Sequence, residues 1–315
     1  MTTEHTHGHC QHDHEEEPST PYHDIYKEAF AKFDLHLHDE IVEEEVKNLC
    51  EKNIEKYRTP EHLSRIFSSV ELTSLRVTDS AESILKWIEK INDFTDAHPN
   101  LPHMAGLCVY PRYAKLLSTS LEVEGMENVC VVGGFPSSQT FPEIKTAETG
   151  LAVMDGATEV DCVMPVGAFL SEDYETVYDE IHEIREAAGK ARLKVILETG
   201  ALDSAALIKR AAIMAIYSGA DFIKTSTGKI SPAATPKAAY VMCRTILEYF
   251  QLTGDRIGFK AAGGIATVDD ALTYYTIARE VLGKEWTDHG LFRIGASRLA
   301  NNLASELLGE KVCAF

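Results

Sequence analysis

Two lysines lie near the ends of short β-rich runs, in a setting that suits covalent chemistry on carbonyl compounds. Lys224 lies in DFIKTSTG (221–228) and Lys260 in IGFKAAGG (257–264). Strand alternation places Phe259 on the face opposite Lys260, so we expect both lysines to point away from the covering helices. A lysine beside a second cation in a partly dry site loses affinity for its proton, and a neutral amine attacks carbonyls to form a Schiff base. The pair predicts an imine-forming lysine.

Two acidic residues on other β-rich runs would balance these lysines. Asp161 lies in EVDCVMP (159–165) and Glu198 in LKVILET (193–199), each on the face that we expect to point inward. Two positive and two negative charges predict a neutral buried layer, which is physically tolerable, whereas an unbalanced layer is costly. The structural alternative is two simple buried ion pairs. Stability does not require such pairs, because apolar replacements are often as good.

Three glycine clusters follow the last three β-rich runs. A glycine permits close backbone approach, and the N-terminus of a following helix offers N–H donors and the positive end of a dipole. Barrels commonly bind phosphate after strands seven and eight. The clusters therefore predict a phosphate site, with three unrelated tight turns as the alternative. The candidate residues are Gly228, Lys229, Gly263, Gly264, Gly295 and Ser297.

Eight strand–helix units must position these residues. Amphipathic segments long enough for a helix separate the β-rich runs, and eight units in about 240 residues fit a (β/α)8 TIM barrel. A doubly wound open sheet is the alternative, but it would show fewer strands and one dominant glycine-rich first turn. Active sites of such barrels lie at the carboxyl ends of the strands. The runs are 70–76, 106–111, 128–136, 159–165, 193–199, 221–228, 257–264 and 291–297.

The ends of the chain differ from this repeating body. Residues 1–21 are acidic and rich in histidine, and they lack aliphatic side chains, so we expect a disordered tail with incidental metal affinity. Apolar residues at helical spacing in 22–67 predict an extension of two or three helices, one beginning at Thr59-Pro60. The barrel is expected over 68–309, and 310–315 form a C-terminal tail.

Composition excludes several classes of protein. The 315 residues carry a formal charge of −19, which repels the phosphate backbones of nucleic acids. No apolar run is long enough to span a membrane, and the first residues lack the features of a secretory signal. The seven cysteines are irregularly spaced and odd in number. We therefore expect a reduced, cytoplasmic protein with no nucleic-acid or membrane partner.

Together these motifs resemble the deoxyribose-phosphate aldolases, a family of class I aldolases. FIKTSTGK (222–229) and FKAAGG (259–264) carry the resemblance most specifically. LCVYPRY (107–113), GGFPSS (133–138), ILETG (196–200) and FRIGAS (292–297) extend it, in order, over residues of roughly 68–300. The resemblance implies a (β/α)8 barrel that binds a sugar phosphate and aldehydes and needs no metal or other cofactor. A homo-oligomer is an expectation that the sequence does not test.

The resemblance also implies roles for the candidate residues. Lys224 would form the Schiff base, Lys260 would favour its neutral form and assist proton transfer, and Asp161 would act through water as the general acid/base. The expected reaction is reversible cleavage of 2-deoxy-D-ribose 5-phosphate to D-glyceraldehyde 3-phosphate and acetaldehyde. The six glycine-cluster residues named above would contact the phosphate. A different class I aldolase, a sugar-phosphate isomerase, or a metal-binding protein that uses the histidine-rich tail remain the alternatives.

Three positions depart from the family pattern. Glu71-Leu72-Thr73 replaces the usual Asp-Leu-Thr, which leaves the hydrogen bonding of this acid open. Ala261 replaces the usual proline after the second lysine, a change that should cost little chemically. Some relatives end in a tyrosine that assists proton transfer, whereas this chain ends in Phe315, which has no hydroxyl group. The role of Glu198, as a lysine partner or a structural acceptor, also stays open.

Overall fold

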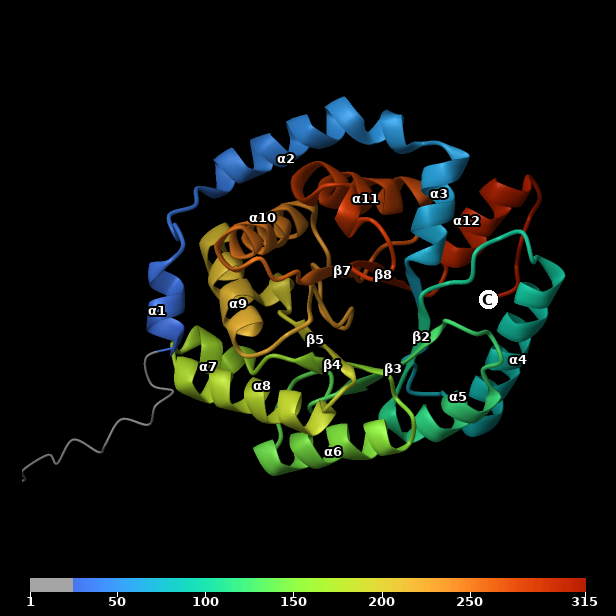
Figure 1. Cartoon of the computed structure of the whole chain (residues 1–315), viewed down its shortest axis with the longest axis horizontal. Coiled ribbons are helices and arrows are strands. Elements are labelled where there is room, and N and C mark those ends of the chain that lie inside the picture. Colours follow the sequence, from blue (N-terminus) through green and yellow to red (C-terminus); the bar gives the residue numbers. More distant parts are fainter. Residues whose placement is uncertain (1–24) are drawn as a thin grey trace, which may run out of the picture.

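Eight parallel strands close into a barrel, in the order in which they occur along the chain (Figure 1). The computed structural model describes residues 25–315. The predicted (β/α)8 barrel is confirmed, because each strand pairs with its sequence neighbours and β8 pairs with β1. The strands are β1 (Val70–Thr73), β2 (Gly106–Val109), β3 (Glu127–Val132), β4 (Glu159–Val163), β5 (Arg192–Ile196), β6 (Phe222–Lys224), β7 (Gly258–Ala262) and β8 (Phe292–Ala296).

Helices follow the strands and cover the outside of the barrel. Their inner faces and the outward side chains of the strands form one continuous apolar core. The α-helices between and after the strands are α4 (Ala81–Ala97), α5 (Ala114–Ser120), α6 (Pro142–Met154), α7 (Val166–Leu170), α8 (Tyr174–Ala188), α9 (Ala205–Tyr217), α10 (Pro236–Thr253), α11 (Val268–Leu282) and α12 (Leu299–Leu308). Short 3₁₀ turns are η2 (Pro111–Tyr113), η3 (Thr199–Ala201) and η4 (Lys284–Trp286).

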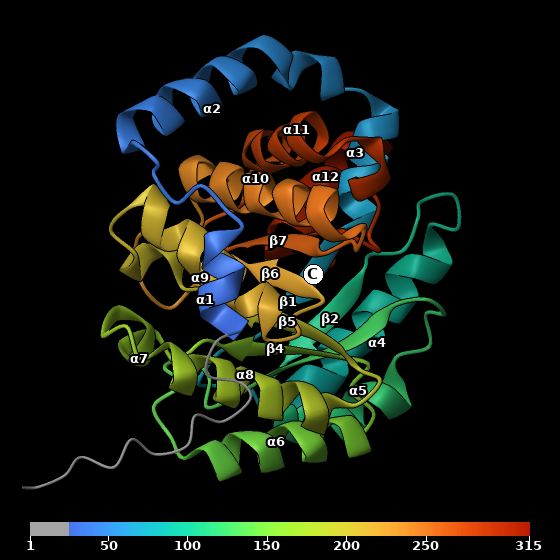
Figure 2. The same ribbon diagram turned by 60° about the vertical axis from the view of Figure 1, so that its left-hand side comes forward.

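Three α-helices precede the first strand. They are α1 (Ile25–Ala31), α2 (Asp39–Asn53) and α3 (Pro60–Ser68), with the turn η1 (Ile54–Tyr57) between the last two. The Thr59 side chain accepts from the His62 N–H and caps α3, as the Thr-Pro start predicts. Figures 1 and 2 show α2 lying outside α10 and α11, while α1 packs on α9. The predicted histidine-rich tail lies outside the described residues.

The register of the barrel brings charged side chains of neighbouring strands side by side. Lys224 on β6 pairs with Lys260 on β7, and Lys260 pairs in turn with Arg293 on β8. Asp161 on β4 pairs with Lys194 on β5. Paired residues of a parallel sheet point to the same face, and in a barrel this face is the interior. The fold therefore assembles one charged layer from many strands.

Several strands are shorter than the predicted runs. The run 221–228 forms a strand only over Phe222–Lys224, because the next residues leave the ladder. The Thr225 hydroxyl donates to the carbonyl of Ala262 and accepts from its N–H, replacing backbone pairing between β6 and β7. Gly228 then turns with a φ of +73°. The residues after Lys224 therefore lie outside the strand, at the carboxyl end of the barrel, where the backbone can contact a ligand.

Residues 25–315 lack two features that are found in other proteins. None of their helices has both the length and the apolar character needed to cross a membrane. No three histidine, cysteine, aspartate or glutamate side chains in this part of the chain are grouped so that they could hold a metal ion.

Candidate active site

A pocket of about 310 Å3 opens at the carboxyl ends of β1, β6, β7 and β8. We call it the mouth pocket. Lys224 lines it, together with all six predicted phosphate residues. A larger pocket of about 730 Å3 lies outside the barrel between α2 and the start of α10, and none of the charged residues inside the barrel lines it. The phosphate residues of the mouth pocket are Gly228, Lys229, Gly263, Gly264, Gly295 and Ser297.

The mouth pocket suits an anion. Four cationic side chains line it and no acidic one does so among the described residues, although the protein as a whole carries −19. Three of the cations, Arg76, Lys229 and Arg298, are exposed to solvent, and α12 begins directly after Arg298. A helix N-terminus adds N–H donors and the positive end of its dipole. The Lys229 ammonium donates to the Leu75 carbonyl at 2.5 Å, so it also ties the loop after β6 to the end of β1.

Glycines keep the walls of this pocket thin. Gly263 has a φ of +94°, and a Cβ there would lie 2.5 Å from the Ala233 Cβ and 2.8 Å from the Ser226 hydroxyl. Only glycine fits this close crossing of two loops. Gly264 has a φ of +81°, and a Cβ there would meet nothing within 4 Å. Its backbone therefore faces open space, where a phosphate oxygen can approach.

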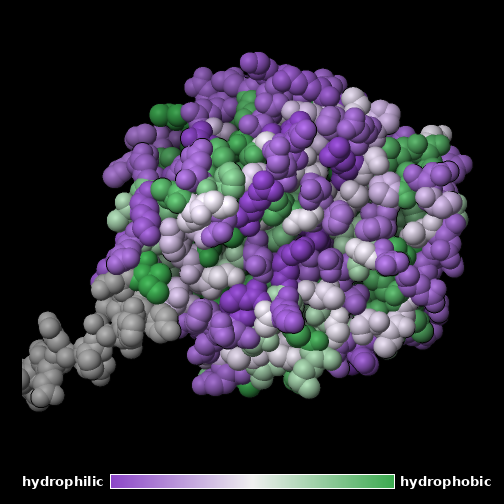
Figure 3. All heavy atoms as spheres, in the orientation of Figure 1, coloured by the Kyte–Doolittle hydropathy of each residue, from purple (hydrophilic) through white to green (hydrophobic). Residues whose placement is uncertain are grey.

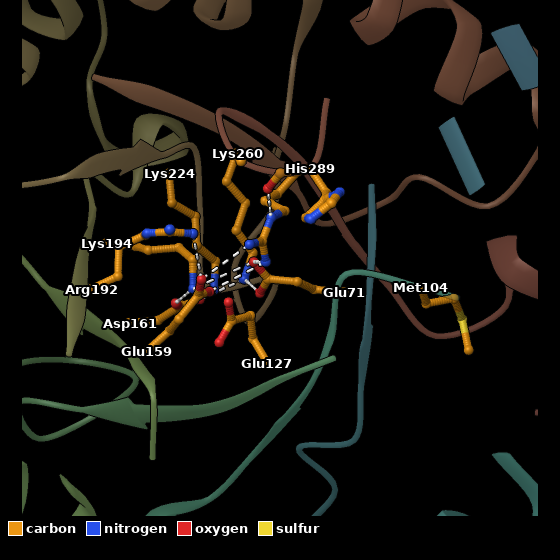
Figure 4. A network of polar contacts seen from close by, with 12 residues as sticks. Glu71, Met104, Glu127, Glu159, Asp161, Arg192, Lys194, Lys224, Lys260 and His289 are labelled. Atoms are coloured by element: carbon orange, nitrogen blue, oxygen red, sulfur yellow. Dashed lines mark hydrogen bonds and ion pairs between the residues drawn. The ribbon is translucent and has the colours of Figure 1, made fainter. Parts of the chain in front are cut away.

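Beneath the mouth pocket, one buried carboxylate joins three lysines (Figure 4). The Lys224 and Lys260 ammonium groups both donate to Oδ2 of Asp161 at 2.7 Å, and Lys194 donates to Oδ1 at 3.0 Å. Asp161, Lys194 and Lys260 are fully buried, and Lys224 is exposed only where it reaches the pocket. The structure thus brings the three predicted catalytic residues together, with a third lysine that the sequence analysis did not identify.

A second tier of ion pairs lies on the far side of these lysines. The Glu71 carboxylate accepts hydrogen bonds from Lys260 and, at 3.0 Å, from Arg293. It also lies 3.4 Å from the Lys194 ammonium. Glu159 lies 2.5 Å from the Lys194 ammonium and 3.0 Å from the Arg293 guanidinium. Glu71, Glu159 and Arg293 are buried inside the barrel. We call the two tiers together the barrel charge layer; its members are Glu71, Glu159, Asp161, Lys194, Lys224, Lys260 and Arg293.

Attraction between opposite charges favours the ionised forms of Asp161, Glu71 and Lys260. Burial alone would raise the pKa of Asp161, but Lys194, Lys224 and Lys260 outweigh it and hold that pKa well below its usual value. Burial opposes ionisation of Glu71 as well, yet Lys194 and Lys260 lower its pKa to about 2. Burial would lower the pKa of Lys260, but Asp161 and Glu71 raise it. Lys260 is therefore a firmly held cation beside Lys224.

Glu198 does not belong to this layer, contrary to the sequence prediction. It follows the end of β5 with a left-handed backbone, φ +53°, so strand alternation no longer sets its direction. Its carboxylate accepts from the Thr227 hydroxyl and from the Thr227 N–H at 3.2 Å. Glu198 is thus a structural acceptor that holds the loop after β6. The predicted neutral set of four charges was wrong for the same reason.

Sequence reasoning missed three members of the layer and left Glu71 open. The signal was the same alternation that found the others. Glu159 lies two positions before Asp161, Lys194 two before Ile196, and Arg293 two before Gly295, all on inward faces. Near the amino end of a β-rich run, the local sequence does not distinguish a buried charged residue from a solvent-exposed one. The sequence analysis therefore did not identify these three residues.

The C-terminal residue takes no part in the mouth pocket. The Phe315 ring packs on Phe94 of α4 with centroids 4.7 Å apart. The Asn301 side chain of α12 accepts from the N–H groups of Ala314 and Phe315 and donates to the Phe315 carbonyl. These contacts hold the last residues between α4 and α12, where Figure 1 marks the C-terminus.

Comparisons with known proteins agree with this geometry. A model of the DeoC/LacD family aldolases matches residues 75–297. Deoxyribose-phosphate aldolase of Homo sapiens is 38% identical over 255 residues, covering 78% of this chain and 80% of the human one. A Caenorhabditis elegans protein that carries the same name provisionally is 40% identical over 264 residues, covering 82% of this chain and 84% of its own.

Solved structures show the same fold. The aldolase QR15 superposes with a TM-score of 0.63 at 29% identity, over 78% of this chain and 96% of its own. The tetrameric deoxyribose phosphate aldolase from Aeropyrum pernix superposes with a TM-score of 0.61 at 24% identity, over 91% of this chain and 98% of its own. The extent of the family match and the identity to curated relatives leave one conclusion: the chain belongs to the DeoC/LacD family of aldolases.

Proposed function

We propose that the protein cleaves 2-deoxy-D-ribose 5-phosphate reversibly to D-glyceraldehyde 3-phosphate and acetaldehyde, with Lys224 as the Schiff-base lysine. One observation carries the assignment: Lys224 lines the mouth pocket, and its ammonium group contacts Asp161 in the barrel charge layer. Lys260 and Lys194 contact the same carboxylate but do not line the pocket. The curated relatives described above are named for the cleavage of deoxyribose phosphate, the Caenorhabditis elegans protein provisionally.

The covalent steps begin with neutral Lys224 attacking the C1 aldehyde of the open-chain sugar. The carbinolamine loses water and leaves a protonated imine. Removal of the C3 hydroxyl proton then breaks the C2–C3 bond, and its electron pair flows into the iminium to form an enamine. Glyceraldehyde 3-phosphate leaves as the aldehyde. Protonation of the enamine carbon and addition of water release acetaldehyde and restore Lys224.

The charged neighbours of Lys224 assist these steps. Lys260 is held as a cation, so it disfavours a second positive charge on Lys224 and can return a proton to the reacting groups. Asp161 keeps both lysines in place through a single oxygen, and a water between Asp161 and the substrate would carry the proton of the C3 hydroxyl. The cationic entrance of the mouth pocket, with Lys229 and Gly264, binds the phosphate.

Borohydride trapping with acetaldehyde tests this proposal. Reduction of the imine leaves an ethyl group on the reacting lysine, and peptide mass mapping locates it. We expect the adduct at Lys224, and its loss together with all turnover in Lys224→Ala. Lys229→Ala is the matched control for trapping alone, because it removes a pocket lysine outside the charge layer and acetaldehyde carries no phosphate; this variant should keep the adduct. Cleavage of the sugar phosphate without any adduct would mean a metal-enolate route. Neither adduct nor cleavage would point to another sugar-phosphate enzyme on the same barrel.

The protein acts in the reducing cytoplasm in this proposal. The six cysteines in residues 25–315 are free thiols, and four of them are buried. Burial raises the pKa of Cys108 to about 11 and that of Cys162 to about 12, which keeps these thiols protonated and unreactive. Unpaired buried thiols are typical of proteins that remain in a reducing compartment.

A second copy of the chain is the partner that α6 fits best. Phe141, the N-cap of α6, is 74% exposed, and Ile144, Leu151 and Met154 of the helix are 55%, 62% and 81% exposed. Figure 3 shows green and pale green atoms along the lower edge, where α6 runs in Figure 1. The four positions are symmetric about the helix centre, so an antiparallel copy would pair Phe141 with Met154 and Ile144 with Leu151. Such self-complementarity is what a two-fold interface requires.

Light scattering on the purified chain tests this interface. We expect a dimer or larger assembly that Leu151→Glu converts to monomers at micromolar concentration, because a charge at the centre of an apolar interface is left unpaired. Leu252→Glu is the control, since Leu252 is an exposed leucine on α10, away from α6. A monomeric parent chain, or equal behaviour of the two variants, would refute the α6 interface.

A further inference from the structure

The barrel charge layer contains more cations than anions. Four basic side chains, Lys194, Lys224, Lys260 and Arg293, face three carboxylates, Glu71, Glu159 and Asp161. At the rim, Arg192 pairs with Glu159 and Glu127 faces Arg293, so these two add one charge of each sign. With every lysine protonated, the layer therefore carries one surplus positive charge in a site from which most water is excluded.

The remaining titratable groups around the layer do not supply the missing negative charge. Cys108 on β2 faces Lys260 and Asp161, and burial raises its pKa to about 11, so its thiol stays neutral. His289 lies beside Arg293, and burial together with that guanidinium lowers its pKa, so its ring stays neutral near pH 7. Because both groups are neutral, the layer keeps its surplus of one positive charge.

The contacts indicate which cation can give up its proton. Lys194 contacts all three carboxylates, whereas Lys260 and Arg293 contact two each. Lys224 forms an ion pair with Asp161 alone among the described residues, and Lys224 is the cation of the layer that lines the mouth pocket. Loss of its proton leaves three cations against three anions. The most weakly held cation is thus the one that becomes the nucleophile.

We propose that Lys194, which does not line the substrate pocket, supplies the surplus charge that sets the pH at which Lys224 becomes nucleophilic. Lys194 is a positioning residue in this scheme, and the inference rests on the proposed Schiff-base function. Its ammonium contacts the opposite oxygen of the carboxylate that Lys224 contacts, so the two cations compete for one anion. A buried ion pair kept for stability alone would need no such excess, because balanced or apolar interiors are at least as stable.

Charge substitutions of opposite sign separate this proposal from a structural role. Lys194→Met removes one cation, so the charges of the layer balance while Lys224 is protonated. The acid limb of the profile of imine-trapping rate against pH should therefore move to higher pH. Glu159→Gln removes one anion and should move that limb to lower pH. The double variant restores one surplus charge and should bring the limb back toward that of the parent chain. Charges about 6 Å apart at an effective dielectric constant of about 20 interact by about 2.8 kcal/mol, which corresponds to a shift of about two pH units.

The rate of imine trapping with acetaldehyde and cyanoborohydride, followed by intact mass across a range of pH, measures the limb. Acetaldehyde carries no phosphate, so ionisation of the substrate does not enter the profile. Lys194→Arg is the matched control, because it keeps the charge and should leave the limb in place. Measuring kcat/KM for the sugar phosphate over the same range shows whether turnover follows the trapping profile.

Each outcome decides one of the two proposals. Opposite shifts for the single variants, reversed in the double variant, support the charge surplus. Trapping at Lys224 with limbs that stay in place, or that move in the same direction, overturns it while leaving the Schiff-base function intact. Absence of trapping in the parent chain overturns the function itself. If Lys194→Met does not fold, Glu159→Gln alone is decisive, since a limb that fails to move to lower pH refutes the surplus.

Discussion

Replacing Asp161 by Asn is the most demanding test of the charge layer. The substitution keeps the shape of the side chain and removes the negative charge that Lys194, Lys224 and Lys260 share at 2.7–3.0 Å. Breaking a buried ion pair by removing one partner costs about 3–5 kcal/mol, because the other charge is left buried and unpaired. Three lysines lose their common acceptor here, so we expect a loss of unfolding free energy of at least about 3 kcal/mol at pH 7.

The loss should depend on pH with a defined sign. Without Asp161, repulsion between the buried lysines lowers their pKa values in the folded state. The folded variant then binds fewer protons than the unfolded chain, so the stability of the variant rises with pH. The gap in stability between the variant and the parent chain should therefore narrow from pH 6 to pH 9. Toward acid, the depressed pKa of Asp161 means that the parent chain itself loses stability as the pH falls below the usual value of 3.8.

Urea denaturation of the two chains, followed by tryptophan fluorescence, measures the gap at each pH. Glu82→Gln is the control, because Glu82 forms an exposed ion pair with Lys86 and should change stability by less than about 1 kcal/mol. A loss for Asp161→Asn below about 1 kcal/mol, or a gap that widens as the pH rises, would refute the shared-carboxylate reasoning. Activity should fall by at least about a hundredfold, since the same carboxylate positions both predicted catalytic lysines.

Four further predictions concern single features of the site. Lys260→Leu should lower kcat/KM by at least about a hundredfold, because a neighbouring cation and proton donor is lost; a mild effect in steady-state kinetics would argue against that role. Lys229→Ala should raise KM for the phosphorylated sugar far more than it changes the cleavage of unphosphorylated 2-deoxyribose; equal effects on both would remove Lys229 from phosphate binding. Protonation of Glu71, whose pKa is held at about 2, should contribute about 3 kcal/mol to the fall in unfolding free energy of the parent chain from pH 4.5 to 2; titration of Glu71→Gln should lack this contribution. Turnover should survive dialysis against EDTA, and a loss that Zn²⁺ reverses would indicate a metal-dependent aldolase.

The ends of the strands show why sequence pattern predicts a site incompletely. Alternation correctly placed Asp161, Lys224 and Lys260 inward, because each lies within a regular strand. The same rule failed at Glu198, where the left-handed backbone after β5 ends the alternation. It also passed over Arg293, which a local pattern does not distinguish from a solvated strand end. The partners of Arg293 are Glu71 and Glu159, 222 and 134 residues away in the chain.

The sequence by itself determined the features that depend on short stretches of chain. The eight β-rich runs and the helical segments between them predict the barrel, and the lysine and glycine motifs predict an imine-forming lysine beside a phosphate site. These properties follow from local periodicity and local turn chemistry, which a single segment carries without its partners.

Only the tertiary structure decided the charge balance around Lys224. Closure of the barrel brings β1 beside β8 and sets Lys194, Lys260 and Arg293 against Glu71, Glu159 and Asp161. Whether a buried lysine stays charged depends on the sum of such distant contacts and on the exclusion of water, and neither is written in any one segment. The sequence therefore identifies Lys224 as the proposed nucleophile, whereas the fold sets the charges that surround it.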